Sequence, residues 1–217
     1  PILVKAGKGM IDPCPLWDDD GRAYLIHAWA GSRSKFNSVL TMWQMSADLT
    51  SLMVQPRIVF DGNDGINHTC EGPKLYKRNG LYYILCPAGG VANVWQLALR
   101  SPKIWGPYES KVVMRQGSTN INGPHQGGMT DAPDGSSWFV NFQELQPWGR
   151  ILHLNPINWV DGWPIMGNNG EPVSEFTAPI ACKIDEKFKP KVDTNSSIGL
   201  QWQWQANYQT CFGMPTT

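Results

Sequence analysis

The chain has 217 residues, enough for one domain of ordinary size or for one domain with part of a second. Its 18 basic and 18 acidic residues give a formal net charge of zero, which argues against nucleic acid as a partner, because phosphate binding relies on clustered positive charge. With 22 Gly, 17 Pro and 11 Trp, the chain is rich in turns and in core-forming aromatics, which excludes a helical bundle and a disordered chain. No run of 18 apolar residues occurs, so we expect no membrane partner.

The five cysteines predict neither a disulfide scaffold nor a zinc ribbon. Their number is odd and they contain no C-x-x-C pair, whereas both kinds of framework need paired spacings. The cysteines are Cys14, Cys70, Cys86, Cys182 and Cys211.

Three segments of the chain share one layout. Each has a polar residue, a short apolar run, a turn with Gly and then an aromatic-rich apolar strand; the segments are 11–29, 71–85 and 125–142. Asp-Gly and Asn-Gly between apolar runs predict hairpins, because both turn positions tolerate a positive φ. The turn glycines Gly21, Gly80 and Gly135 are 59 and 55 residues apart. The sequence therefore predicts an internal repeat.

Further strands are expected after each hairpin. The predicted third strands are 39–45, 95–99 and 150–154, and the predicted outer strands are 57–60 and 111–114. Units of about 50 residues with three or four short strands are typical of β-propeller blades. A β-sandwich with coincidental spacing is the alternative fold. Closed propellers need about four to eight blades, so three units predict an interior piece of a larger propeller.

The composition changes after the third unit. We expect a partial β-propeller catalytic domain at 1–167, a linker at 168–190 and the start of a C-terminal β-sandwich at 191–217. The last prediction rests on 199–205, where apolar and polar residues alternate with the period of a strand.

A polar residue opens each repeat. Asp12 and Glu71 precede their turn glycines by nine residues, and His125 precedes its own by ten. We therefore expect one structural position, at the start of the innermost strand, to carry Asp, Glu and His in three successive blades and to aim them at one axis. Convergent ionisable groups in a concave site are typical of acid/base chemistry. Taken singly, Asp12 could cap a turn before Pro13, and His125 could be a structural donor or an ion ligand.

Two carboxylates that face each other across a cleft suit glycoside hydrolysis. One must stay protonated to donate to the leaving oxygen, while another activates water or attacks the sugar. A partly desolvated channel would drive the two pKa values apart. Tryptophans near such a site are common platforms for sugar rings.

The motifs resemble glycoside hydrolase family 43. Segment 10–21 resembles the family's "IDP…DDDG" blade and segment 68–80 its "EGPK" blade, while 121–128 and 149–154 are similar to later blades. The tail at 199–205 is similar to the opening of the β-sandwich that some members carry. The resemblance covers nearly the whole chain and implies an all-β, five-bladed β-propeller, of which about three blades are present together with the start of the sandwich, so that the chain is truncated at both ends.

The resemblance also implies roles for four residues. The family consists of inverting enzymes, in which Glu71 resembles the general acid and Asp12 the carboxylate that tunes the pKa of that acid. His125 resembles the central histidine, which in some members lies by a bound calcium, and Arg150 resembles the arginine of the innermost sugar subsite. No cofactor is required for the chemistry, and a structural calcium at His125 is the one metal implied. No residue matches the general-base Asp of the first blade, so we expect the base to be missing from this chain, which alone would then be inactive.

These features support three hypotheses. The first is a truncated arabinofuranosidase or xylosidase that acts on arabinose- or xylose-containing plant polysaccharides or oligosaccharides. The second is a non-catalytic carbohydrate-binding fragment that keeps the channel, and the third is a fragment that folds poorly because its terminal blades expose unpaired edges. We expect a carbohydrate partner and an extracellular or periplasmic location.

Overall fold

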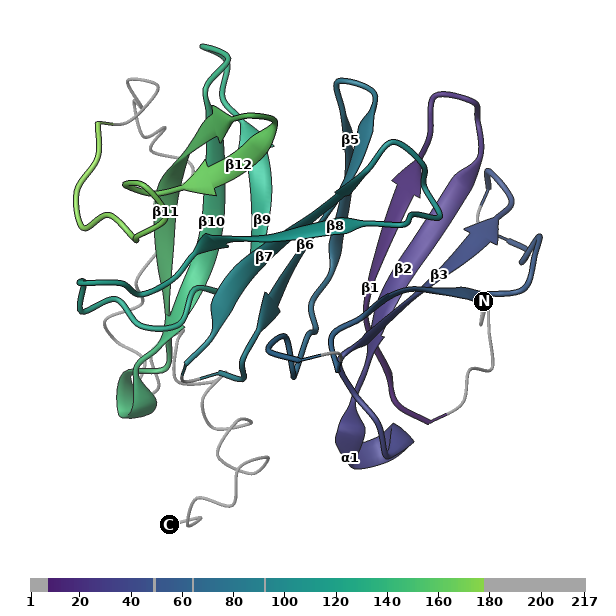
Figure 1. Ribbon diagram of the computed structural model, residues 1–217, viewed down its shortest axis with the longest axis horizontal. Helices are drawn as coiled ribbons and strands as arrows, with labels where there is room; N and C mark the ends of the chain where they lie inside the picture. Colours follow the sequence, from purple (N-terminus) through teal and green to yellow (C-terminus); the bar gives the residue numbers. More distant parts are fainter. Residues whose placement is uncertain (1–7, 49, 64, 92, 178–217) are drawn as a thin grey trace, which may run out of the picture. The chain divides into compact units, whose positions relative to one another are not determined.

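The computed structural model describes residues 8–48, 50–63, 65–91 and 93–177. These residues form three four-stranded antiparallel sheets that follow one another along the chain (Figure 1). The strand orders are β1-β2-β3-β4 in the first sheet, β5-β6-β7-β8 in the second and β12-β11-β10-β9 in the third. The strands are β1 (Met10–Trp17), β2 (Ala23–Trp29), β3 (Val39–Met45), β4 (Arg57–Asp61), β5 (Lys74–Arg78), β6 (Leu81–Ala88), β7 (Trp95–Ser101), β8 (Glu109–Met114), β9 (His125–Asp131), β10 (Ser137–Glu144), β11 (Arg150–Val160) and β12 (Trp163–Met166). Two short helical turns, α1 (Gly31–Ser34) and η1 (Gln146–Trp148), complete the regular structure.

The predicted hairpin turns are confirmed. Gly21, Gly80 and Gly135 have φ values of 79°, 76° and 84°, which L-residues with a side chain adopt at a cost. The turns differ in length, because five residues separate the last paired residues of β1 and β2 and of β9 and β10, whereas only two separate those of β5 and β6. This difference affects how the innermost strands align, as described below.

Each pair of neighbouring sheets shares a hydrophobic core. Between the first and second sheets, Ile26 and Met42 meet Ile84 of β6, and all three side chains are fully buried. Between the second and third sheets, Leu85 of β6 meets Phe139 of β10. Adjacent residues of β6 thus point into different cores, so the second sheet is covered on both faces. The sequence of β6 is accordingly a continuous apolar run rather than an alternating one.

Polar contacts also join the sheets at their edges. Tyr76 of β5 accepts a hydrogen bond from the Met129 amide of β9 at 2.8 Å. Asp18 lies in the β1–β2 turn, where it is paired with Lys77 and accepts a hydrogen bond from Tyr82. Burial alone would raise the pKa of Asp18, but these hydrogen bonds, led by that of Lys77, outweigh burial and hold the pKa below its ordinary value. The charged pair therefore fastens the first turn to the second sheet.

The architecture confirms the all-β, blade-like fold class. The predicted third and outer strands are all present, and β7, β8 and β11 extend beyond the predicted ranges. A fourth strand in the third sheet, β12, was not predicted; it pairs with the second half of β11. Within the predicted linker at 168–190, Asn168 and Glu171 form an isolated β-bridge. Residues 178–190 and the predicted sandwich start at 191–217 lie outside the described residues, and the predicted domain boundaries stay predictions.

In the described part of the chain, no helix has the length and apolar character that crossing a bilayer requires.

Each innermost strand contains or follows a β-bulge. In β1 the register shifts between Ile11 and Cys14, and in β9–β10 it shifts where His125 pairs with Phe142. In the second sheet, the Glu71 amide donates to the Pro87 carbonyl at 3.2 Å, whereas Lys74 pairs with Leu85, so one extra residue again lies on the inner strand. The first bulge residues are Asp12, Gly72 and Gln126, with left-handed φ values of 55°, 56° and 40°.

The bulge in β9 leaves no room for a side chain at Gly127. A Cβ there would lie 2.1 Å from Cζ of Phe139 and 2.5 Å from the carbonyl oxygen of Val140. Gly127→Ala should therefore lower the free energy of unfolding by about 1–3 kcal/mol or more through overpacking. Urea unfolding of the complete encoded protein, followed by tryptophan fluorescence, measures the effect.

Gly135→Ala is the matched control in the same sheet. No atom lies within 4 Å of a Cβ at that turn, so the cost there is conformational only, about 1 kcal/mol at its φ of +84°. Equal destabilisation by the two substitutions would contradict the close packing of the bulge.

Candidate active site

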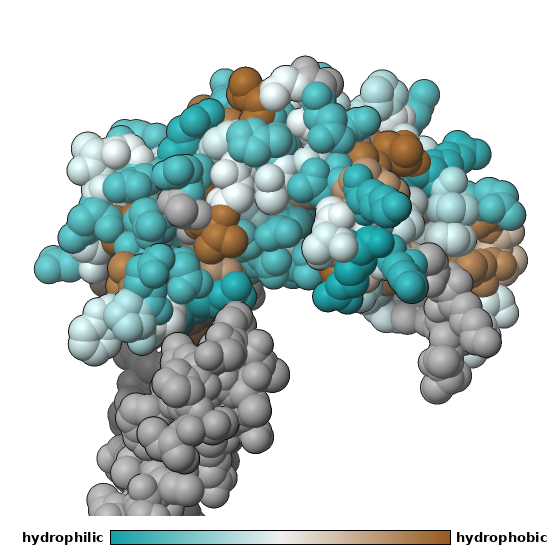
Figure 2. Space-filling model, turned by 90° about the horizontal axis from the view of Figure 1, so that it is seen from below, coloured by the Kyte–Doolittle hydropathy of each residue, from teal (hydrophilic) through white to brown (hydrophobic). Residues whose placement is uncertain are grey.

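The predicted site residues lie at one end of the three sheets, where β1 and β9 begin and where residues 71–73 lead into β5. Asp12 is in β1, Glu71 precedes β5 and His125 is the first residue of β9. Figure 2 looks at this end of the sheets and shows a mostly hydrophilic surface with separate hydrophobic patches. The sequence prediction that these residues come together is supported by the contacts described next.

The predicted common register is right for two of the three residues and off by one for the third. The bulges make Glu71 and His125 equivalent to Ile11, whereas Asp12 is equivalent to Gly72 and Gln126. The offset arises because the β5–β6 turn has two fewer residues before its glycine than the other two turns, while β5 has one more paired residue after its bulge than β1 or β9. Counting back from the turn glycine therefore reaches a position one residue different in the second blade.

Asp12 connects all three sheets. Its Oδ2 accepts a hydrogen bond from the Gly72 amide at 3.0 Å and a longer one from Nε2 of Gln126 at 3.4 Å. Gly72 itself packs tightly on Gln126, because a Cβ at position 72 would lie 2.9 Å from Cγ of that residue. The three bulge residues thus contact one another, with the Asp12 carboxylate between them.

Glu71 and His125 are paired. Oε1 of Glu71 lies 3.2 Å from Nε2 of His125, whose side chain is only 3% exposed, compared with 24% for Glu71. The hydrogen bond with His125 holds the pKa of Glu71 below its ordinary value, opposed by burial and assisted by Gln126 and by the positive charge of Arg150. Glu71 is therefore ionised at neutral pH in this geometry.

Arg150 and His125 contact the same aromatic ring. The imidazole of His125 stacks on Phe142, with ring centres 4.9 Å apart and planes at 24°. The Arg150 guanidinium lies 4.5 Å from the centre of the same phenyl ring, and its Nε lies 3.3 Å from Oε2 of Glu144. These contacts order the predicted subsite arginine beside the predicted acid.

The predicted metal role of His125 finds little support in the donors around it. Nδ1 of His125 is buried without a hydrogen-bond partner in the structure. Among the described residues, however, no group of three or more His, Cys, Asp or Glu side chains could hold an ion, and calcium needs six to eight oxygen ligands. The donor set present does not fit calcium, and the metal role stays a prediction.

Other residues at this end of the sheets were not predicted. A pocket beside Arg150 is lined by Asn122, Glu144 and the η1 turn, in which Trp148 is 80% exposed. The side-chain oxygen of Asn122 is buried without a partner in the structure. An exposed tryptophan next to a pocket offers a flat apolar surface of the kind that sugar rings stack on. Only the richness of the sequence in Trp hinted at such a residue.

Two buried thiols lie directly behind Glu71. Sγ of Cys70 and Sγ of Cys86 are 3.1 Å apart, and both residues are fully buried. The hydrogen bond between them, together with burial, raises the pKa of the Cys70 thiol well above its ordinary value. The Cys70 thiol is therefore neutral at pH 7 and contributes packing rather than charge next to the candidate acid.

The arrangement fits acid/base chemistry on a polar substrate. It brings together two carboxylates from different sheets, a buried histidine and an exposed arginine. Side chains make the Glu71–His125 and Arg150–Glu144 contacts, and the backbone amide of the bulge residue Gly72 donates to Asp12. Partly buried carboxylates with distinct partners are the groups that glycoside hydrolysis uses.

Comparison with known proteins identifies the family. The sequence pattern of glycosyl hydrolases family 43 matches residues 1–164, and the chain belongs to this family. A relative from Xylanibacter ruminicola, which carries the name of a beta-xylosidase, is 42% identical over 211 residues, covering 94% of this chain and 39% of the relative. A non-reducing end alpha-L-arabinofuranosidase of Bacteroides ovatus is 28% identical over 158 residues, which cover 63% of this chain and 29% of the length of that relative.

A solved structure shares the fold. The crystal structure of xylan beta-1,4-xylosidase from Bacillus halodurans superimposes with a TM-score of 0.73 at 26% identity, covering 88% of this chain and 39% of that one. The chain thus spans about two fifths of the length of the first relatives that it matches.

The depressed pKa of Glu71 gives the fold a pH dependence. Because the folded-state pKa lies below the ordinary value of 4.5, the pairing stabilises the fold above that pH and loses its effect as the pH falls through the depressed value. Glu71→Gln should therefore be less stable than the wild type at pH 7, and the difference should shrink as the pH falls below about 4.5. Thermal unfolding at several pH values measures it.

Glu109→Gln serves as the control, because the Glu109 side chain is 71% exposed and, within the part of the chain that the structure describes, forms an ion pair with Arg100 alone. Its effect should be small at each pH. A stability difference for Glu71→Gln that stays constant down to pH 3 would show that the pairing with His125 does not depend on the carboxylate charge.

Proposed function

We propose that this chain forms part of an inverting glycoside hydrolase that releases arabinose or xylose residues from plant polysaccharides or oligosaccharides, with Glu71 as general acid and Asp12 as the residue that tunes its pKa. One observation carries the proposal: Asp12 of the first sheet binds the amide of Gly72, directly after Glu71, while Glu71 binds His125 of the third sheet. The names of the relatives support the substrate class.

The proposed acid must gain a proton before it can act. In the present geometry the hydrogen bond from His125 favours the ionised form of Glu71. A bound sugar would displace water from this carboxylate, and desolvation raises the pKa of a carboxyl group. The nearby negative charge of Asp12 would act in the same direction, which is the tuning role that we assign to it.

Two further residues are proposed to contact the sugar. Arg150 is exposed and points its guanidinium over Phe142, next to the Glu71–His125 pair, from where it can donate to sugar hydroxyls. His125 would fix the orientation of the Glu71 carboxylate and border the sugar. The general base is not assigned to any described residue, and the chemistry needs no cofactor. An extracellular or periplasmic location belongs to the same proposal.

A second candidate function is a non-catalytic carbohydrate-binding unit. The observation that favours it is the lowered pKa of Glu71, because an ionised carboxylate accepts hydrogen bonds from sugar hydroxyls but does not protonate a leaving group. Sugar binding without turnover by the complete encoded protein would support this second function.

The leaving group distinguishes a general acid from other roles. Glu71→Gln should lower kcat on xylo- or arabino-oligosaccharides by about 10²–10⁴-fold, because their alkoxide leaving groups need a proton. The loss should be much smaller on dinitrophenyl glycosides, whose leaving group departs without protonation. Initial rates of the complete encoded protein on both substrate classes measure the effect.

The control variant is again Glu109→Gln, which should keep wild-type rates on both classes. An equal loss on both classes for Glu71→Gln, or a change of only a few-fold, would contradict the acid assignment.

Asp12→Asn tests the tuning role. The amide oxygen can still accept the hydrogen bond from Gly72, but the negative charge is lost. Glu71 should then ionise more easily, and the basic limb of the pH profile of kcat/KM should move to lower pH. A reduced rate with an unmoved basic limb would instead assign Asp12 a purely structural role.

A further inference from the structure

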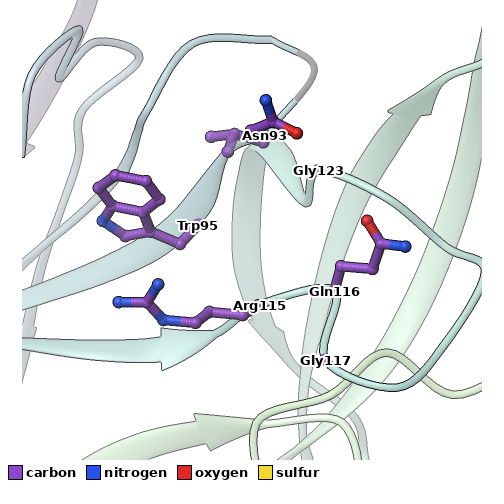
Figure 3. A pocket seen from close by; sticks show the side chains of 7 residues that line it. Asn93, Trp95, Arg115, Gln116, Gly117 and Gly123 are labelled. Carbon is purple, nitrogen blue, oxygen red and sulfur yellow. The ribbon is translucent and has the colours of Figure 1, made fainter.

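A pocket of about 210 Å³ lies beside the candidate active site and has no part in the chemistry proposed above. It is formed by the loop that leads into β7, the segment that follows β8 and the approach to β9 (Figure 3). Its lining residues are Asn93, Val94, Trp95, Arg115, Gln116, Gly117 and Gly123. None of the lining residues is acidic, but the Glu171 carboxylate lies against Gly117, where a Cβ would be 2.1 Å from its Oε1, and it accepts a hydrogen bond from the Ser118 hydroxyl at 2.7 Å.

Arg115 supplies a positive charge to this pocket. Its side chain is exposed, and among the described residues no Asp or Glu lies within ion-pair distance of its guanidinium. The guanidinium lies 5.1 Å from the centre of the Trp95 ring, and the two side chains lie beside each other in Figure 3. The fork of donors is therefore held over an aromatic face, while it remains available to a carboxylate.

The walls of the pocket are fixed by contacts outside it. Trp95 donates from Nε1 to Asn67 at 3.3 Å and packs against Gly89, where a Cβ would lie 2.4 Å from the indole. The backbone amide of Arg115 donates to the Gly170 carbonyl at 2.8 Å. A bound ligand would meet a preformed site, which lowers the entropic cost of binding.

Residues at the pocket are close in sequence to residues of the candidate active site. His68, which lies edge-on to Trp95 with ring centres 5.9 Å apart, is three residues before Glu71. Gly123 is two residues before His125. A saccharide with one residue at Glu71 therefore has this pocket within reach of a neighbouring residue or substituent.

We propose that this pocket binds the carboxylate of a uronic acid carried by the saccharide substrate, with Arg115 as the residue that pairs with the carboxylate and Trp95 as the aromatic wall. The inference rests on the proposed function, since it concerns the substrate of that same site. A neutral sugar would leave the guanidinium without a counter-charge, whereas a carboxylate matches its fork with two parallel hydrogen bonds. Asn93 at the rim can donate a further hydrogen bond to a sugar hydroxyl.

Binding to two matched ligands tests the proposal. A xylo-oligosaccharide substituted with glucuronic acid should bind the complete encoded protein more tightly than the unsubstituted oligosaccharide. Arg115→Gln should weaken binding of the substituted ligand by about tenfold, the range of a lost charge-assisted hydrogen bond, and leave the unsubstituted ligand within about twofold. Isothermal titration calorimetry measures both, and the difference should shrink as salt is raised.

Arg57→Gln is the matched control, because Arg57 also lies over a tryptophan, 4.9 Å from the Trp105 ring, but outside the pocket. It should leave both affinities unchanged. The proposal is overturned if Arg115→Gln affects both ligands equally or neither, or if acetate at the same concentration competes as well as the uronic acid, since the site would then recognise any small anion.

Hydrolysis of a neutral aryl glycoside separates this inference from the proposed function. If Arg115→Gln leaves both that rate and the uronic acid affinity unchanged, the pocket proposal fails and the hydrolase proposal stands. If the wild type hydrolyses no glycoside but shows the Arg115-dependent affinity, the hydrolase proposal fails and the pocket is a binding site only.

Discussion

The candidate site depends on one contact between two sheets, the hydrogen bond from the Gly72 amide to the Asp12 carboxylate. In a regular strand that amide would donate to the neighbouring strand or would point outward from the edge of the sheet. The bulge places an extra residue on the inner strand, so the amide is released from pairing and becomes a donor at the centre of the site. Because Asp12 itself lies at the equivalent bulge of the first sheet, the same distortion supplies both donor and acceptor.

The rigidity of the site comes from the second sheet. Ile84 and Leu85 point into separate cores, so β6 is held from both faces, and the segment that carries Glu71 runs along it. A catalytic side chain is positioned best when the elements behind it cannot shift. On this side the buried thiols of Cys70 and Cys86 contact each other, and the raised pKa of the Cys70 thiol keeps it uncharged next to Glu71.

The sequence predicted the hairpins and the three sheets, because turns and alternation are local signals, and the roles of its four candidate site residues stay predictions. It missed the bulges, and with them the one-residue offset of Asp12. A bulge depends on how two strands pair and leaves little trace in either strand alone, and the shorter β5–β6 turn compensated for the offset in the count from the glycines. It also did not single out Trp148 or Arg115. Neighbours distant in sequence decide whether a tryptophan is exposed and whether an arginine has an acidic partner among the described residues.

The charges around Glu71 set the direction in which a ligand must act. His125 and Arg150 both favour the carboxylate, and burial opposes them. In the proposed hydrolase, a saccharide that covers Arg150 with its hydroxyls would weaken that electrostatic support and would also remove water from Glu71. Both effects would raise the pKa of the proposed acid. The Phe142 ring contacts both His125 and the Arg150 guanidinium, and the exposed Arg150 can engage a ligand while the Glu71–His125 hydrogen bond stays in place. Under that proposal, substrate binding and protonation of Glu71 would be coupled through three side chains of the second and third sheets, those of Glu71, His125 and Arg150.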